Sequence, residues 1–217
     1  QEWDKLKAAG KIRWGADQEG GAPYIFPSDQ NPDVMIGFEV DMAEKMSDQL
    51  GLKVDFQQGQ WDTLPSMLQA QKIDIVMNGY EWMPERVEAM ETSIPYYVYA
   101  EQLMVNKDGP ITSWDVLRKP NPEGGKWRVG VLSATAAEEV MKAIPTVDTI
   151  SYDGVTDSMR EVETGKLDAT LQDTPIANYY IKDFPGLKMV GDPVSPGYYV
   201  IYARKGEHEL ISRINAS

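Results

Sequence analysis

The amino-acid sequence predicts an α/β protein in which the sheets are mainly parallel. Short runs rich in β-branched residues alternate along the chain with segments whose apolar residues recur at helical spacing. The 217 residues allow one large domain or two small ones with a substantial core, and they contain no internal repeat. We therefore expect βαβ units throughout the chain.

Composition excludes several classes of function. The formal net charge of −13 argues against a general basic patch for nucleic acid or for an anionic membrane. The chain has no cysteine, which excludes disulfides and thiolate chemistry. Its single histidine, His208, lies in a charged stretch that we expect to be solvated. No Ser-His-Asp triad or multi-histidine site can be assembled, so we expect no catalytic residue, metal ion or cofactor.

The first half of the chain begins with alternating helix and strand signals. Gly10 and Gly51 stand where the apolar periodicity stops, as is typical of helix ends. The predicted elements are a helix over 3–10, a strand over 11–15, a helix containing Met42, Met46 and Leu50, and a strand over 52–57. We expect the methionines of this helix to fill the core.

The second half continues the alternation. A polar segment with two prolines and two glycines, 119–126, predicts a surface loop. The other predicted elements are a helix over 111–117, a strand, turn and helix over 127–139, a strand over 147–152, a helix over 155–163, a strand over 167–173, a loop over 191–195 and a strand over 197–202.

The stretch 73–86 indicates where a ligand would bind. An apolar run over 73–77 predicts a buried strand, and Asn78-Gly79 closes it. Open α/β sheets bind ligands in the crevice at the ends of such strands. Pro84 suits the first turn of the helix that follows, because proline lacks only an N–H that is unpaired there.

Arg86 lies just inside this helix. Its planar guanidinium matches a carboxylate in two parallel hydrogen bonds, which makes it a candidate ligand-binding residue. The alternative is a solvated helix arginine that pairs with Glu85 or Glu88.

Several motifs in a fixed order carry a resemblance to a known family. The pattern G-x-x-x-x-P-E-R over 79–86 is followed, seven residues later, by Ile-Pro-Tyr-Tyr over 94–97. Gly-Phe-Glu-Val-Asp over 37–41 and Trp-Asp-x-Leu over 61–64 precede them. In order and spacing these motifs resemble the periplasmic solute-binding proteins of polar amino-acid ABC transporters, the family 3 extracellular solute-binding proteins. The resemblance covers nearly the whole chain.

The resemblance implies a two-lobed, type II periplasmic-binding-protein-like fold, each lobe a mainly parallel sheet flanked by helices. Lobe 1 is expected to be discontinuous, over 1–99 and 200–217, and lobe 2 to span 100–199. Two hinge strands near 99–103 and 196–200 would join them. Relatives usually continue for one more helix, so we expect either a trimmed chain or a natural one that continues, for instance into a fused membrane permease.

The resemblance also implies which residues hold the main-chain end of an amino acid. Arg86 would clamp the α-carboxylate, and Ser133 and Thr135 would bind the same group at the start of a helix. Asp173 would take the α-ammonium group, with Gln172 as a second polar contact. For the residues at helix starts, a plain helix cap without a ligand is the alternative.

Other residues would meet the ligand side chain. Asp17 occupies the position that resembles the aspartate facing the distal cation in binders of cationic amino acids, and Glu19 lies nearby. A solvated loop carboxylate is the alternative for either. Trp61 would form one wall of the pocket, with Tyr24 or Phe26 opposite, although a hydrophobic staple would also explain a tryptophan before a helix.

The strand end itself contributes Asn78, Gly79 and Glu81 to the expected site. Relatives usually have threonine or serine where this chain has Glu81. A glutamate in a cleft with other carboxylates is suited to general acid catalysis. It is equally suited to pairing with Arg86.

We therefore expect a periplasmic, monomeric protein that binds a free polar, cationic amino acid and delivers it to an ABC transporter permease. Glutamine is the alternative ligand. An enzyme on the same scaffold, similar to cyclohexadienyl dehydratase, is the first alternative function. A ligand-sensing domain of a larger membrane protein is the second. Nucleic acid is not an expected partner.

Overall fold

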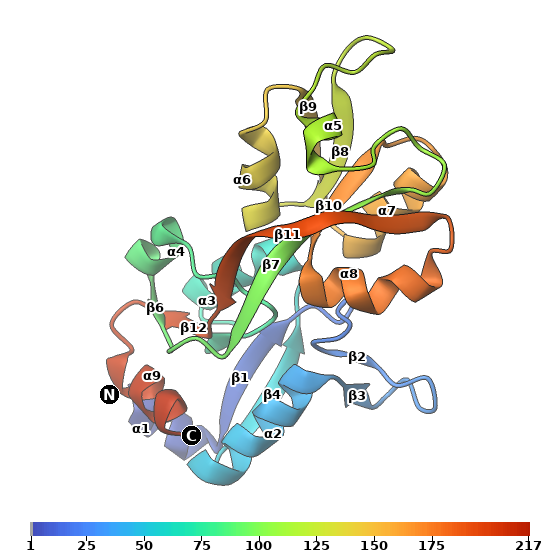
Figure 1. Cartoon of the computed structure of the whole chain (residues 1–217). Coiled ribbons are helices and arrows are strands. Elements are labelled where there is room, and N and C mark those ends of the chain that lie inside the picture. Colours follow the sequence, from blue (N-terminus) through green and yellow to red (C-terminus); the bar gives the residue numbers. More distant parts are fainter. Residues whose placement is uncertain (1) are drawn as a thin grey trace. The chain divides into compact units, whose positions relative to one another are not determined.

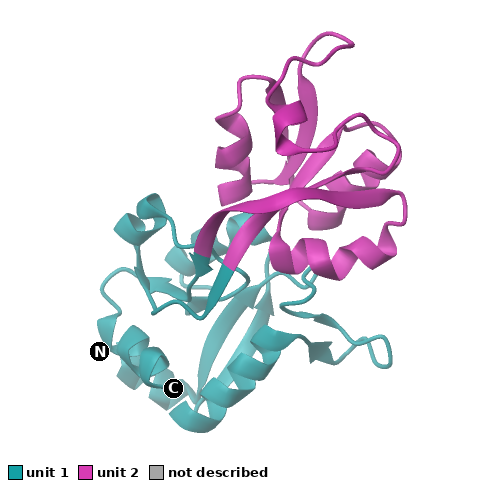
Figure 2. Ribbon diagram, viewed as in Figure 1, with its two compact units in different colours: residues 1–98, 198–217 teal, residues 99–197 magenta. Residues whose placement is uncertain are grey.

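The protein divides into two compact units (Figure 2). The computed structural model describes residues 2–217. Unit 1 contains the chain up to Val98 and from Tyr198 onward, and unit 2 runs from Tyr99 to Gly197. The chain passes from one unit to the other within two long strands, β7 (Tyr97–Asn106) and β11 (Leu187–Tyr199) (Figure 1). Strands and helices alternate in both units, which makes the fold α/β.

Unit 1 is built on a five-stranded sheet in the order β4-β1-β5-β12-β6. Its strands are β1 (Lys11–Ala16), β4 (Lys53–Gln58), β5 (Ile75–Val76), β6 (Met90–Thr92) and β12 (Tyr202–Arg204), with a small β2–β3 pair (Phe26–Pro27, Met35–Ile36). Its helices are α1 (Glu2–Ala9), α2 (Phe38–Leu50), α3 (Leu64–Gln69), α4 (Pro84–Ala89) and α9 (His208–Ala216), with a 3-10 turn, η1 (Trp61–Thr63).

The first three strands of this sheet run parallel, and the last two are antiparallel to their neighbours. β1 pairs in parallel with both β4 and β5, whereas β12 is antiparallel to β5 and β6. The carboxyl ends of β1, β4 and β5 therefore meet at one edge of the sheet. The loops that leave this edge carry most of the predicted ligand residues.

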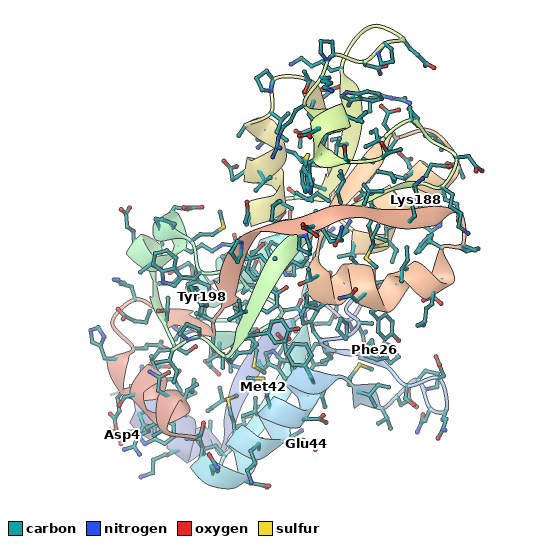
Figure 3. All side chains as sticks on the ribbon, viewed as in Figure 1. Asp4, Phe26, Met42, Glu44, Lys188 and Tyr198 are labelled. Atoms are coloured by element: carbon teal, nitrogen blue, oxygen red, sulfur yellow. The ribbon has the colours of Figure 1, made fainter. Side chains whose placement is uncertain are left out.

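Helix α2 shows how the sequence pattern builds the core of unit 1. Its buried residues Glu39, Ala43 and Met46 follow the spacing of one helical face. Met42 packs against the same core, while Glu44 is exposed to solvent (Figure 3). The helix ends at Gly51, whose left-handed φ of 66° glycine adopts without steric cost. The predicted core role of the methionines is confirmed.

Unit 2 has its own five-stranded sheet in the order β11-β7-β10-β8-β9. β8 is parallel to both β9 and β10, and β10 is antiparallel to β7. Besides β7 and β11, the elements are β8 (Trp127–Leu132), β9 (Val147–Tyr152), β10 (Ala169–Asp173), α5 (Trp114–Leu117), α6 (Ala136–Lys142), α7 (Val155–Glu163), α8 (Thr174–Tyr180) and the 3-10 turn η2 (Ile181–Asp183).

One predicted loop is wrong. The segment 191–195, predicted as a loop, contains one glycine and one proline and belongs to strand β11. β11 lies at the edge of the sheet, where a proline costs no ladder hydrogen bond on its open side. Gly191 and Ser195 have positive φ angles of 68° and 49°, so the chain turns locally while the strand continues.

Candidate functional site

Asp17 follows β1 directly and is buried at the carboxyl edge of the unit 1 sheet, with 8% of its surface exposed. Its carboxylate accepts hydrogen bonds from the side-chain amide of Gln58 at 2.7 Å and from the backbone N–H groups of Glu19 and Trp61 at 2.9 and 3.3 Å. All three donors are neutral. Glu19, the nearby candidate, is exposed. The structure thus places Asp17, but not Glu19, among the buried groups at the strand ends.

Asn78 connects this edge of the sheet to Trp61. Its side-chain oxygen accepts the N–H of Asp17 at 2.9 Å, and its carbonyl accepts the indole N–H of Trp61 at 2.9 Å. Trp61 is 7% exposed and begins η1, ahead of α3. The two loops after β1 and β5 are therefore joined through one asparagine. Three predicted ligand residues lie together at this point.

Tyr80 is part of the same cluster and was not predicted. Its ring stacks on that of Trp61, with centroids 4.2 Å apart and 22° between the planes, and its hydroxyl donates to the Trp61 carbonyl at 2.5 Å. The guanidinium carbon of Arg86 lies 4.7 Å from the Tyr80 ring centroid and 5.3 Å from that of Trp61. These distances allow cation–π attraction to both rings.

Arg86 pairs with Glu81, rather than with Glu85 or Glu88. Its Nη1 donates to the Glu81 carboxylate at 2.7 Å and to the Glu81 carbonyl at 3.0 Å. Glu81 is 1% exposed. Burial would lower the pKa of Arg86, but the charge of Glu81 and the nearby hydroxyls outweigh it, and the pKa is raised. Arg86 is thus held as a cation within the protein.

Gly79 and Tyr24 are in close contact. Gly79 has a φ of 59°, and a Cβ on it would lie 2.9 Å from the Tyr24 ring, so the position requires glycine. Tyr24 is buried, and its hydroxyl shares a hydrogen bond of 2.7 Å with that of Tyr199. Its ring contacts Phe38 edge to face. Tyr24 therefore lies against the Gly79 backbone inside unit 1.

Glu39 is a second residue that the sequence analysis missed. One carboxylate oxygen accepts the N–H of Gly79 at 2.7 Å and the hydroxyl of Tyr96 at 2.5 Å. The other oxygen has no hydrogen-bond partner among the described residues. Complete burial raises the pKa of Glu39 to about 7, although these hydrogen bonds oppose the shift. The apolar spacing through Ala43 and Met46 is the signal that places Glu39 on the buried face of α2.

In unit 2, Ser133 and Thr135 lie between β8 and α6. Thr135 caps α6: its hydroxyl oxygen accepts the N–H of Glu138 at 3.3 Å and its hydroxyl donates to the Leu132 carbonyl at 2.7 Å. Glu138 accepts the N–H of Ala134 at 2.8 Å. The predicted helix cap is therefore present. Ser133 is half-buried beside it.

Gln172 and Asp173 end β10, next to β8 in the same sheet. Gln172 is buried and its amide donates to the hydroxyls of Thr170 and Ser158, at 2.8 and 3.1 Å, so its NH₂ group belongs to a network within unit 2. Asp173 is 7% exposed. It precedes α8 at the cap position, yet its side chain makes no capping hydrogen bond. A plain helix cap does not account for Asp173.

The motifs and this geometry agree with a comparison against known protein families. Residues 12–217 match the model of the bacterial extracellular solute-binding proteins, family 3.

The chain belongs to this family.

Individual members of the family and solved structures are similar over most of their lengths. The chain is 26% identical over 215 residues to the ABC transporter arginine-binding protein 1 of Escherichia coli (strain K12), covering 96% of this chain and 84% of that one. It is 29% identical, with a TM-score of 0.87, to the ancestral amino-acid-binding protein AncCDT-1, described as a precursor of cyclohexadienyl dehydratase, covering 100% and 91% of the two chains. An ancestral arginine-binding protein bound to glutamine is 30% identical, with a TM-score of 0.85 and coverage of 95% and 89%.

Family membership confirms the predicted resemblance and, with it, the two-lobed periplasmic-binding-protein type of fold. None of the described helices is both long and apolar enough to cross a membrane. Within residues 2–217, no group of three or more histidine, aspartate or glutamate side chains could hold a metal ion. The predicted ligand residues of this family 3 protein fall into two sets. Unit 1 holds Asp17, Tyr24, Trp61, Asn78, Gly79, Glu81 and Arg86, and unit 2 holds Ser133, Thr135, Gln172 and Asp173.

Proposed function

We propose that this protein binds a free, polar and cationic amino acid outside the cytoplasm and delivers it to an ABC transporter permease. Membership of the extracellular solute-binding proteins supports the location and the transport role. The similarity to a protein named as an arginine-binding component of an ABC transporter supports the ligand class. The permease is either a separate protein or fused to this chain, and the binding protein acts as a monomer.

The main observation in favour of a cationic ligand is the buried carboxylate of Asp17. It lies at the carboxyl edge of the parallel strands, where α/β sheets bind ligands. The N–H groups that it accepts are neutral, and no lysine or arginine of the described chain forms an ion pair with it. A buried carboxylate without a cation is costly, and a cationic ligand would supply the missing charge.

Ligand binding would close the two units around their connecting strands, β7 and β11. Asp17, Trp61 and Arg86 belong to unit 1, while Thr135 and Asp173 belong to unit 2. A ligand that contacts both sets stabilises only the closed arrangement, so it shifts the population toward closure. In this proposal Asp173 takes the ligand's α-ammonium group and Trp61 packs along its side chain.

A thermal-shift screen of the twenty amino acids tests the proposal. A ligand present at 100 times its Kd should stabilise the fold by about 2.7 kcal/mol, which raises the melting temperature measurably. Calorimetric titration then ranks arginine, lysine, histidine and glutamine. Tighter binding of glutamine than of the three cations, or an unchanged affinity for arginine in Asp17→Asn, would contradict the cationic ligand.

A dehydratase on this scaffold is the alternative function, favoured by the similarity to AncCDT-1. Glu81 would serve as the general acid of such an enzyme. It forms an ion pair with Arg86, which is the non-catalytic role expected for it from the sequence. An assay with prephenate-like acids separates the two functions. Formation of product would favour the enzyme, whereas binding without turnover would favour the transport protein.

A further inference from the structure

Glu81 and Arg86 form an ion pair that is almost fully withdrawn from water. The Arg86 side chain is 10% exposed and that of Glu81 is 1% exposed. The same guanidinium nitrogen contacts the Glu81 carboxylate at 2.7 Å and its carbonyl at 3.0 Å. The hydroxyl of Tyr202, on β12, also donates to that carbonyl at 2.9 Å. The pair is therefore fixed to the sheet as well as to the loop that carries it.

Aromatic rings hold the guanidinium from another direction. The Arg86 guanidinium carbon lies 4.7 Å from the Tyr80 ring centroid and 5.3 Å from that of Trp61. Turning Arg86 toward a new anion would give up cation–π attraction as well as the bond to Glu81. The orientation of the guanidinium is thus set by the protein before any ligand arrives.

An incoming carboxylate would have to share Arg86 with Glu81 or displace Glu81 from it. Two carboxylates at one guanidinium repel each other. A displaced Glu81 would be a buried charge without its cation, which is strongly unfavourable. Both routes reduce the affinity that a carboxylate gains from Arg86.

The same arrangement favours a cation. Asp17 and Glu81 contribute two carboxylates to the unit 1 set of predicted ligand residues, and Arg86 contributes one guanidinium. Within this set of three side chains, one negative charge is therefore left over. An ammonium or guanidinium group is attracted to it whether or not the ligand also carries a carboxylate.

We propose that Glu81 sets the charge selectivity of the site: as the resident anion of Arg86, it directs the site to cationic ligands and makes a ligand α-carboxylate dispensable. Amino-acid amides, and amines that lack the carboxylate, are then ligands of the same class as the free cationic amino acids. Glu81 is a positioning residue, because it acts on the ligand through Arg86. The inference rests on the proposed function, since it concerns the same site.

The test compares L-arginine with L-argininamide, which differ only in the carboxylate, by calorimetry. The wild-type protein should bind the two within about threefold, and Glu81→Gln should shift the ratio toward arginine by at least about tenfold, or 1.4 kcal/mol. Glu85→Gln, an exposed acid in the first turn of α4, is the matched control and should leave the ratio unchanged. A merely structural role of Glu81 would weaken both ligands equally.

The outcomes separate this inference from the proposed function. If another amino acid binds best in the thermal screen, that amino acid and its α-amide are compared in place of L-arginine and L-argininamide. Wild-type preference for the free acid by more than about tenfold, or an unchanged ratio in Glu81→Gln, overturns the role of Glu81 and leaves the proposed function standing. If neither amino acids nor amides bind, the proposed function fails. Should Glu81→Gln not fold, the wild-type ratio decides alone.

Discussion

Arg86 is expected to matter for stability as well as for binding. Replacing it with alanine leaves the buried Glu81 carboxylate without its cation, which typically costs about 3–5 kcal/mol. The free energy of unfolding of Arg86→Ala, measured by urea denaturation without ligand, should therefore be lower than that of the wild type by an amount of that order. Arg160→Ala is the control, because Arg160 pairs with Asp157 on the surface of unit 2 and should cost less than about 1 kcal/mol. Equal losses in the two variants would contradict a structural role for the buried pair.

Glu39 should make the stability of the fold depend on pH. Its pKa is about 7 in the folded protein and about 4.5 in the unfolded chain, so between these values the folded state binds more protons. Its contribution to stability is present below pH 4.5 and is lost as the pH rises through about 7. Glu39→Gln should remove this loss, which amounts to at most about 3 kcal/mol at 1.36 kcal/mol per pKa unit.

Urea unfolding at pH 5 and pH 8 measures how much the free energy of unfolding falls with pH in Glu39→Gln and in the wild type. The exposed Glu44 of the same helix supplies the control, and Glu44→Gln should follow the wild-type dependence. Parallel pH dependences of Glu39→Gln and wild type would show that Glu39 does not titrate in this range.

At the scale of the elements, the turn before α6 carries local strain. Ala134 has a φ of 61°, a left-handed conformation that costs a residue with a Cβ about 1–2 kcal/mol. Ala134→Gly should therefore raise the free energy of unfolding, measured by chemical denaturation, by about 1 kcal/mol. The greater conformational entropy of glycine in the unfolded chain offsets part of this gain. Ala136→Gly, at the first residue of helix α6, should instead destabilise the protein by less than about 1 kcal/mol, because glycine is the poorer helix former. A loss of stability in Ala134→Gly would contradict the conclusion that the backbone at Ala134 is strained.

Elements whose signals are local were predictable from the sequence. β9 and α7 begin and end where the apolar periodicities over 147–152 and 155–163 do, because each pattern sits between turn residues. The prediction of a loop over 191–195 failed because an edge strand tolerates the proline and the glycine of this segment. Whether a strand lies at an edge depends on the order of the sheet, which local sequence does not reveal.

The candidate site was predictable to the same degree. Asn78 and Arg86 were singled out because they follow a strand and begin a helix, and Asp17 because of the family resemblance; all three belong to unit 1. The bond between Glu39 and Gly79 joins residues 40 positions apart, and no local pattern announces it. The stack of Tyr80 on Trp61 is missed for the same reason. Long-range side-chain partners require the fold.

At the scale of the whole molecule, ligand binding is expected to compact the protein. A ligand held by residues of both units favours their closed arrangement, and losing either set of contacts removes that bias. Small-angle X-ray scattering should show a smaller radius of gyration when the best ligand of the thermal screen is added. Asp17→Asn in unit 1 and Asp173→Asn in unit 2 should each abolish the change at the same ligand concentration. Asp153→Asn, an exposed change in unit 2, should retain it. A ligand that raises the melting temperature but leaves the radius of gyration unchanged would show that it binds without closing the two units.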